Sequence, residues 1–187
     1  GPSLTRPMRF GIKLNASGIT GPGLIETARA AEALGFDSLW NSESYGSDAV
    51  SPLAWAGAHT ERLRLGTNIM QTVARTPAMT AMTAMTMDLI TDGRFVLGLG
   101  SQIQPHIERR FSMPWSAPAG RMREYLAAMQ AIWHAWDTGT KLDFHGEHYQ
   151  HTLMTPMFSP EPNPHGPPRV VLAAVGPLMT TVAAECA

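Results

Sequence analysis

The sequence has a single cysteine, no long apolar run and no excess of charge of either sign. Cys186 alone cannot form an internal disulfide, and no apolar stretch reaches the roughly 18 residues that a membrane helix needs. Fourteen basic against fifteen acidic side chains leave a formal net charge of -1. Because the arginines are scattered, we expect no nucleic-acid partner and no membrane partner, and we predict a cytoplasmic protein.

The composition is that of one globular domain. The chain has 187 residues, of which 44% are hydrophobic, enough for a core of its own. Residues 1–4 resemble the remnant of a cleaved expression tag, and no charged and apolar leader precedes Met8. We therefore treat residues 1–7 as tag remnant and leader, and expect the folded part to span residues 8–187.

Short apolar runs alternate with longer stretches whose apolar residues fall on one face. The clearest helix follows Arg121, with a stripe from Met122 to Trp136 and Gly139 as its stop. Residues 139–168, with a possible hairpin around 145–149 and then six prolines, are expected to form a surface insertion. The predicted strands are residues 9–14, 36–40, 63–68, 95–99 and 169–173, and the predicted helices are 24–34, 52–59, 76–91, 121–136 and the residues after 177.

This alternation predicts an α/β fold, a parallel sheet with helices outside. It does not distinguish an open doubly wound sheet from a closed eight-unit barrel. A complete barrel takes about 200 to 400 residues, so five strands in 187 residues exclude a complete barrel if the strand count is right. An open sheet fits this length without strain.

Residues 35–43, 61–69, 92–100 and 172–177 form four blocks at the predicted strands, and they resemble the strand blocks of the luciferase-like monooxygenase family. Residues 107–115 and 153–160 are similar to an actinobacterial branch of this family that depends on coenzyme F420, a deazaflavin. The resemblance covers the chain from about Met8 to its end. It implies a partial (β/α)8 TIM barrel of about five β/α units, truncated after strand five.

By this resemblance, a cofactor lies over the carboxyl ends of the strands. The family places a non-proline cis peptide at the end of strand three, which here falls between Asn68 and Ile69 and would support the cofactor ring. Free amides at the start of the last helix favour phosphate. The implied cofactor-binding residues are Thr67, Asn68, Ile69, Gly100, Ser101, Ala173, Ala174, Val175 and Gly176.

Two residues at the strand mouths are candidate proton donors in a hydride transfer, Glu43 and His106. Some deazaflavin enzymes of the family carry a catalytic histidine one place after the position of Glu43. This chain has Ser44 there, so the role of that histidine cannot be transferred to it. For Glu43, capping of the next helix is the structural alternative. For His106, the alternative is a surface histidine in a polar loop.

Three other patterns have simpler explanations. Gly98 and Gly100 lack the third glycine of a dinucleotide-binding fingerprint. The histidines at 145, 148 and 151 would alternate faces in a hairpin, so no metal site is predicted. The methionines at 79, 82, 85 and 87 stand at helical spacing and are expected in the core.

The resulting hypothesis is an oxidoreductase that transfers a hydride between F420 and an unknown small organic substrate. An FMN-dependent monooxygenase of the same family and a non-catalytic flavin-binding or structural fragment remain alternatives, so whether the chain is itself an enzyme stays open. Because a sheet cut from a barrel exposes edges and an apolar inner face, we expect a homo-oligomer or a second chain that completes the barrel.

Overall fold

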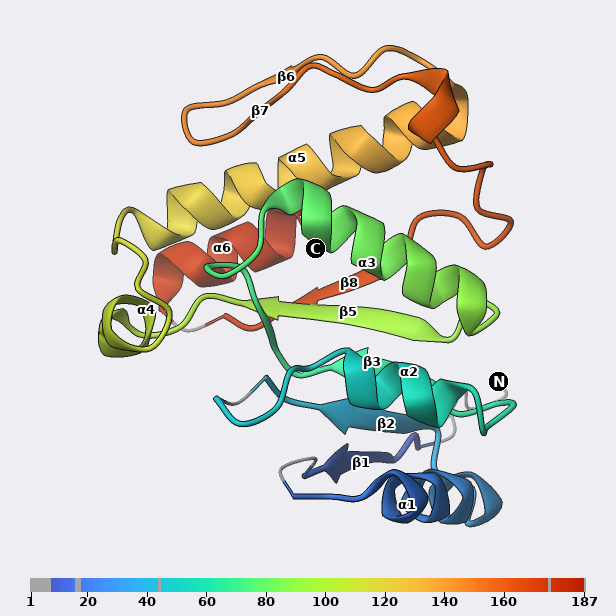
Figure 1. Cartoon of the computed structure of the whole chain (residues 1–187). Helices are drawn as coiled ribbons and strands as arrows, with labels where there is room; N and C mark the ends of the chain where they lie inside the picture. Colours follow the sequence, from blue (N-terminus) through green and yellow to red (C-terminus); the bar gives the residue numbers. More distant parts are fainter. Residues whose placement is uncertain (1–7, 16–17, 44, 175, 187) are drawn as a thin grey trace, which may run out of the picture.

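A sheet whose pairings are all parallel forms the centre of the computed structural model, which describes residues 8–15, 18–43, 45–174 and 176–186 (Figure 1). The strands follow the order β1-β2-β3-β5. β4 continues the line of β3 along β5, and β8 pairs with the other side of β5. The strands are β1 (Gly11–Leu14), β2 (Ser38–Asn41), β3 (Arg64–Thr67), β4 (Met70–Gln71), β5 (Phe95–Gly100) and β8 (Arg169–Leu172).

Helices connect the strands of the parallel sheet, as the alternation predicted, except that β4 follows β3 directly through residues 68–69. Thr20 and Thr76 cap two of them, since each hydroxyl accepts a hydrogen bond from a first-turn amide, at 3.1 and 3.2 Å. The antiparallel hairpin of β6 (Phe144–His145) and β7 (Gln150–His151) lies beyond α5 (Figure 1). The helices are α1 (Gly21–Ala33), α2 (Ser51–Gly57), α3 (Pro77–Ile90), α4 (Gln104–Arg109), α5 (Pro118–Thr138) and α6 (Pro177–Cys186), with a 3-10 turn at Pro156–Phe158.

The two faces of the sheet differ in their surroundings. Leu39 and Leu65 point to the helix side and are fully buried. On the opposite side, Lys13 and Arg169 are exposed and Val171 keeps 50% of its surface accessible. The alternation between buried and exposed positions along β1 and β8 therefore marks one face packed by helices and one face uncovered.

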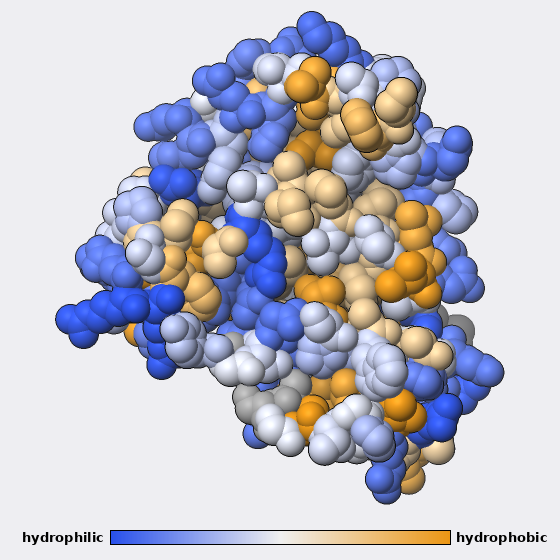
Figure 2. Space-filling model, in the orientation of Figure 1, coloured by the Kyte–Doolittle hydropathy of each residue, from blue (hydrophilic) through white to orange (hydrophobic). Residues whose placement is uncertain are grey.

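The buried faces of the helices agree only in part with the faces predicted from the sequence. The predicted face of α5 is buried, from Met122 to Trp136. In α3, however, Met79 and Met82 are about half exposed, at 50% and 49%, whereas Met85 is buried. The expectation that the whole methionine series is core was wrong, because the outer side of α3 also carries methionine. Apolar surface over this helix is visible in Figure 2.

Candidate functional site at the strand ends

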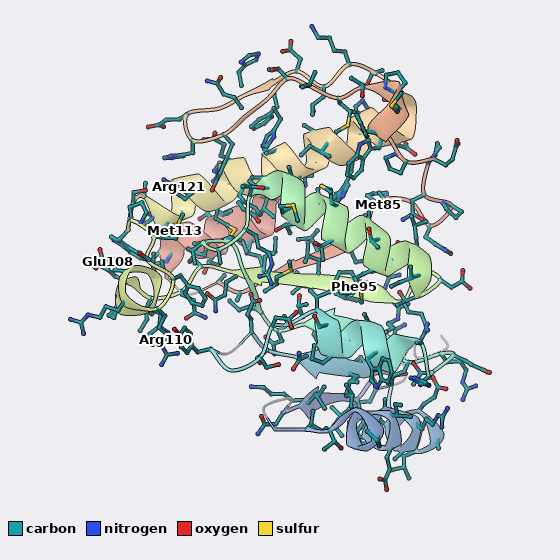
Figure 3. All side chains as sticks on the ribbon, viewed as in Figure 1. Met85, Phe95, Glu108, Arg110, Met113 and Arg121 are labelled. Carbon is teal, nitrogen blue, oxygen red and sulfur yellow. The ribbon has the colours of Figure 1, made fainter. Side chains whose placement is uncertain are left out.

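The parallel strands direct their carboxyl ends toward one edge, where α4 and the start of α6 also lie (Figure 1). Figure 3 shows Phe95 at the far end of β5 from Glu108 and Met113, which follow this edge. A cavity of about 460 Å³ opens here, lined among others by Ser101, Trp115 and Ala173. Its size falls within the range of small-molecule sites, about 300 to 1,000 Å³.

This cavity brings together three of the predicted cofactor residues, Ser101, Ala173 and Gly176. Gly100 lies beside them, because a Cβ atom at this position would stand 3.5 Å from the Cβ of Ala173. Ala174 is exposed and does not line the cavity, and Val175 lies outside the described residues. The ends of β5 and β8, which are far apart in the sequence, thus face one cavity.

The peptide bond between Asn68 and Ile69 is cis, which confirms the geometry expected at the end of strand three. Asn68 donates its N–H to the carbonyl of Asn41 at 2.8 Å, and Glu43 donates its N–H to the carbonyl of Ile69 at 3.1 Å. The Ile69 side chain lies over Gly100, where a Cβ atom would stand only 2.2 Å from Ile69 Cδ1. The bulge is therefore held by the segment after β2 and rests on β5.

The Thr67 hydroxyl already has partners within the sheet. It donates to the carbonyl of Gly98 at 2.8 Å and accepts from the N–H of the same residue at 2.8 Å. A Cβ atom at Gly98 would stand 1.9 Å from the Thr67 carbonyl oxygen, so the close approach of β3 and β5 requires glycine. Packing of the sheet thus accounts for Gly98, and Thr67 is fully buried.

Glu43 forms an ion pair rather than a helix cap. Both of its carboxylate oxygens accept from the Arg75 guanidinium, each at 2.5 Å, and one also accepts from the N–H of Gln71 at 2.9 Å. The hydrogen bonds that Arg75 donates to Glu43 raise the pKa of Arg75 despite partial burial. Asp48 accepts instead from the amides of Val50 and Ser51 at the start of α2. A bidentate pair of this kind fixes the position of both side chains.

Behind this pair lie two buried residues that the sequence interpretation missed. Tyr125 donates to the carbonyl of Arg75 at 3.1 Å, and burial raises its pKa. Gln71 is 2% exposed and donates from Nε2 to the carbonyl of Glu43 at 3.3 Å, but its Oε1 has no partner among the described residues. In the sequence, Gln71 could have been singled out as a polar residue shortly after the expected bulge. Tyr125, in contrast, has the sequence pattern of an ordinary core residue.

His106 lies in α4 rather than in a loop. Its Nδ1 is 3.2 Å from Oε1 of Gln102, and Gln102 lines the strand-end cavity while His106 does not. Ser112 and Ala117 adopt positive φ angles of 53° and 33° on either side of Trp115. This backbone is uncommon for residues other than glycine, and Trp115, which lies between them, lines the cavity.

The histidines of the hairpin do not converge. Nε2 of His145 is 2.8 Å from Oδ1 of Asp143, and both side chains are largely exposed. Across the described part of the chain, no three His, Cys, Asp or Glu side chains gather closely enough to hold a metal ion. None of the helices in that part combines the length and apolarity needed to cross a membrane.

The architecture is part of an α/β barrel with a ligand-sized cavity at the carboxyl ends of its strands. Residues 7–187 match the model of the luciferase-like monooxygenase family, and the chain belongs to this family.

Among curated proteins, the chain is 52% identical over 162 residues to an uncharacterized protein of Mycobacterium tuberculosis, covering 87% of the chain and 47% of that protein. It is 32% identical over 190 residues to the F420-dependent glucose-6-phosphate dehydrogenase 1 of Rhodococcus jostii, covering 94% of the chain and 54% of the relative. The chain thus spans about half the length of these relatives.

Solved structures share the fold. The coenzyme F420-dependent tetrahydromethanopterin reductase of Methanopyrus kandleri aligns with a TM-score of 0.76 at 21% identity, over 96% of the chain and 54% of that structure. The oxygenating constituent of 3,6-diketocamphane monooxygenase from Pseudomonas putida, in complex with FMN, aligns with a TM-score of 0.71 at 17% identity, over 88% and 51%. The fold of this chain therefore occurs both in a structure whose name specifies coenzyme F420 and in a structure solved in complex with FMN.

Proposed function

We propose that the chain forms the cofactor-binding part of an oxidoreductase that transfers a hydride between coenzyme F420 and a small organic substrate. The observation that carries this proposal is the cavity at the strand ends, where Ser101, Ala173 and Gly176 meet next to Gly100, on which the Ile69 side chain packs. The names of the F420-dependent relatives support a deazaflavin.

The residues present fit such a cofactor. Ser101, Ala173 and Gly176 are small and leave room for a planar ring to approach the backbone. Ile69, packed on Gly100, offers an apolar surface next to them. The first turn of α6 borders the same cavity, and helix starts favour phosphate. When bound, the deazaflavin would supply the hydride chemistry, while the chain's own residues bind and orient it.

Proton donation falls to residues other than Glu43. The ion pair with Arg75 supports a role for Glu43 in holding the bulge in place. His106, linked through Gln102 to the cavity wall, remains the candidate acid, with Gln102 as the contact to the ligand.

Fluorescence-quenching titrations with F420 and, separately, with FMN test the proposal. We expect F420 to bind more tightly, and Ala173→Phe, which fills the cavity, to abolish binding. Ala30→Phe on the exposed side of α1 is the matched control and should bind normally. Preferential binding of FMN would favour the monooxygenase alternative, which the FMN-bound neighbour supports. Binding of neither cofactor would favour a non-catalytic fragment.

A further inference from the structure

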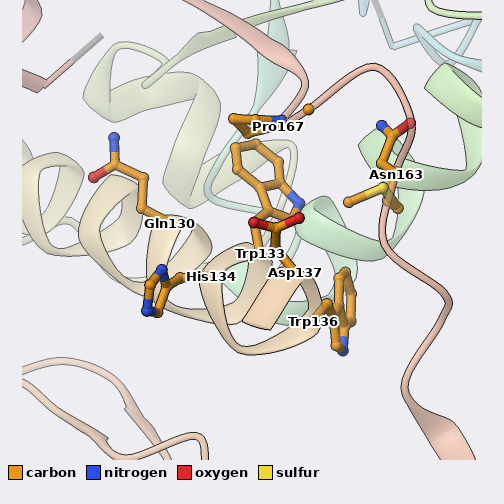
Figure 4. A pocket seen from close by; sticks show the side chains of 9 residues that line it. Gln130, Trp133, His134, Trp136, Asp137, Asn163 and Pro167 are labelled. Atoms are coloured by element: carbon orange, nitrogen blue, oxygen red, sulfur yellow. The ribbon is translucent and has the colours of Figure 1, made fainter. Parts of the chain in front are cut away.

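A second cavity, of about 190 Å³ and called the outer cavity below, lies between α3, α5 and the segment that leads into β8 (Figure 4). It is formed by the second half of α5, by Met85 of α3 and by the segment 163–167 that leads to β8. None of the residues that line it also lines the strand-end cavity. Its role is therefore independent of the proposed oxidoreductase function.

The walls of this outer cavity are fixed by hydrogen bonds on the sides that face the core. Trp133 is 4% exposed and donates from Nε1 to the carbonyl of Ala81 at 3.1 Å. Asn163 donates from Nδ2 to Oδ2 of Asp88 at 2.8 Å. With their polar atoms engaged, these side chains and Pro167 present a preformed and largely apolar recess.

The charge at the recess is negative. Asp137 stands in the last turn of α5, beside the ring of Trp133 in Figure 4, and its carboxylate makes no hydrogen bond or ion pair within the described residues. A helix end of this kind already carries partial negative charge and disfavours a carboxylate. Helix stability therefore does not explain Asp137. His134 is the single base among the lining residues, and its ring points away from Trp133 (Figure 4).

We propose that the outer cavity binds an organic ammonium ion carried on a small apolar body, such as an arylalkylamine. The apolar body would lie against Trp133 and Pro167, and the ammonium group would lie at Asp137. An apolar cavity of about 150 Å³ accommodates benzene, so the outer cavity, at about 190 Å³, matches a ligand of the size of benzylamine. Aromatic faces and a carboxylate both favour a cation over a neutral molecule of the same shape.

Saturation-transfer NMR on the full chain tests this with benzylamine and, as the neutral molecule of the same shape, benzyl alcohol. At low salt, where surface charges are least screened, we expect benzylamine to bind about threefold to tenfold more tightly. Asp137→Asn should remove this preference. Asp137→Lys should abolish amine binding, since its own ammonium group would occupy the recess. Glu26→Gln and Glu26→Lys on the exposed face of α1 are matched controls and should change neither.

Equal binding of the amine and the alcohol to the unmodified chain would overturn the proposal, as would an amine preference that survives in Asp137→Asn. Absence of amine binding at millimolar concentration would overturn it too. Because Asp137 is exposed, both variants are expected to fold, and coincident thermal unfolding curves would verify this.

Discussion

Arg75 and Glu43 face each other as a bidentate ion pair, with both nitrogen–oxygen distances at 2.5 Å. The pair joins the loop after β2 to the connection between β4 and α3, and the Glu43 amide also binds the carbonyl of Ile69. The ion pair therefore fixes the segment whose backbone amide holds the bulge at Asn68 and Ile69. This relationship is the basis for proposing Glu43 as a support of the candidate site.

Replacing Glu43 by Gln should lower the free energy of unfolding by about 1 to 3 kcal/mol, because Arg75 would lose its charged partner in a partly buried place. Glu61→Gln removes a carboxylate from an exposed contact with Arg62 at 3.8 Å and should change stability by less than about 0.5 kcal/mol. Urea unfolding measures both. If Glu43→Gln unfolds at the same urea concentration as the unmodified chain, the supporting role is wrong.

Gly98→Ala should destabilise the fold by about 3 kcal/mol, because the new Cβ would meet the Thr67 carbonyl oxygen, and backbone cannot easily move aside. Gly120→Ala is the matched control in the first turn of α5, where no atom lies within 4 Å. It should leave stability unchanged or raise it by up to about 1 kcal/mol. Thermal unfolding compares the two variants, and a similar effect of both would contradict the close approach of β3 and β5.

Glu32 should make stability depend on acid pH. Burial tends to raise its pKa, but the backbone amides of Arg62, Leu63 and Glu61 outweigh burial and lower the pKa below 4.5. A depressed folded-state pKa contributes stability above the unfolded value, and this contribution is lost as pH falls through the folded value.

Glu32→Gln should therefore unfold at lower urea concentration than the unmodified chain at pH 7, and the difference should shrink below about pH 4. The residue is only partly buried, so we expect an effect of about 1 kcal/mol or less. A difference that is constant from pH 7 to pH 3 would show that the three amide contacts do not require the charge.

The uncovered face of the sheet should drive association, either with a second copy or with a chain that completes the barrel. Val171 is 50% exposed on this face, and β1 and β8 have free edges within the described sheet. Light scattering after gel filtration should give a mass above 20.3 kDa. Val171→Lys should weaken association, while Leu34→Lys at the exposed end of α1 should not. A compact monomer at all concentrations would contradict this expectation.

The elements that the sequence predicted well are those with a strong period or a clear end signal. The stripe along α5 and the alternation of strands and helices depend on local spacing, and both are present in the fold. The cis peptide came from the family resemblance, since no local pattern around Asn68 would predict it.

What the sequence did not reveal depends on contacts between distant segments. Glu43 and Arg75 are 32 positions apart, and no local pattern pairs them. β4 has two residues and α4 has six, too few to show a period. Thr67 has the residue type of a ligand contact, but the approach of β5 directs its hydroxyl to Gly98. The sequence thus revealed candidate site residues, whereas the residues that they contact could be identified only from the folded structure.

Hydrogen–deuterium exchange with and without F420 tests the central claim most directly, because it locates the binding surface without relying on turnover. Binding at the strand-end cavity predicts protection in residues 100–103, 113–119 and 176–180, with little change in α1 or in the hairpin of β6 and β7. Protection elsewhere, or none at saturating F420, would contradict the assignment of this cavity as the cofactor site.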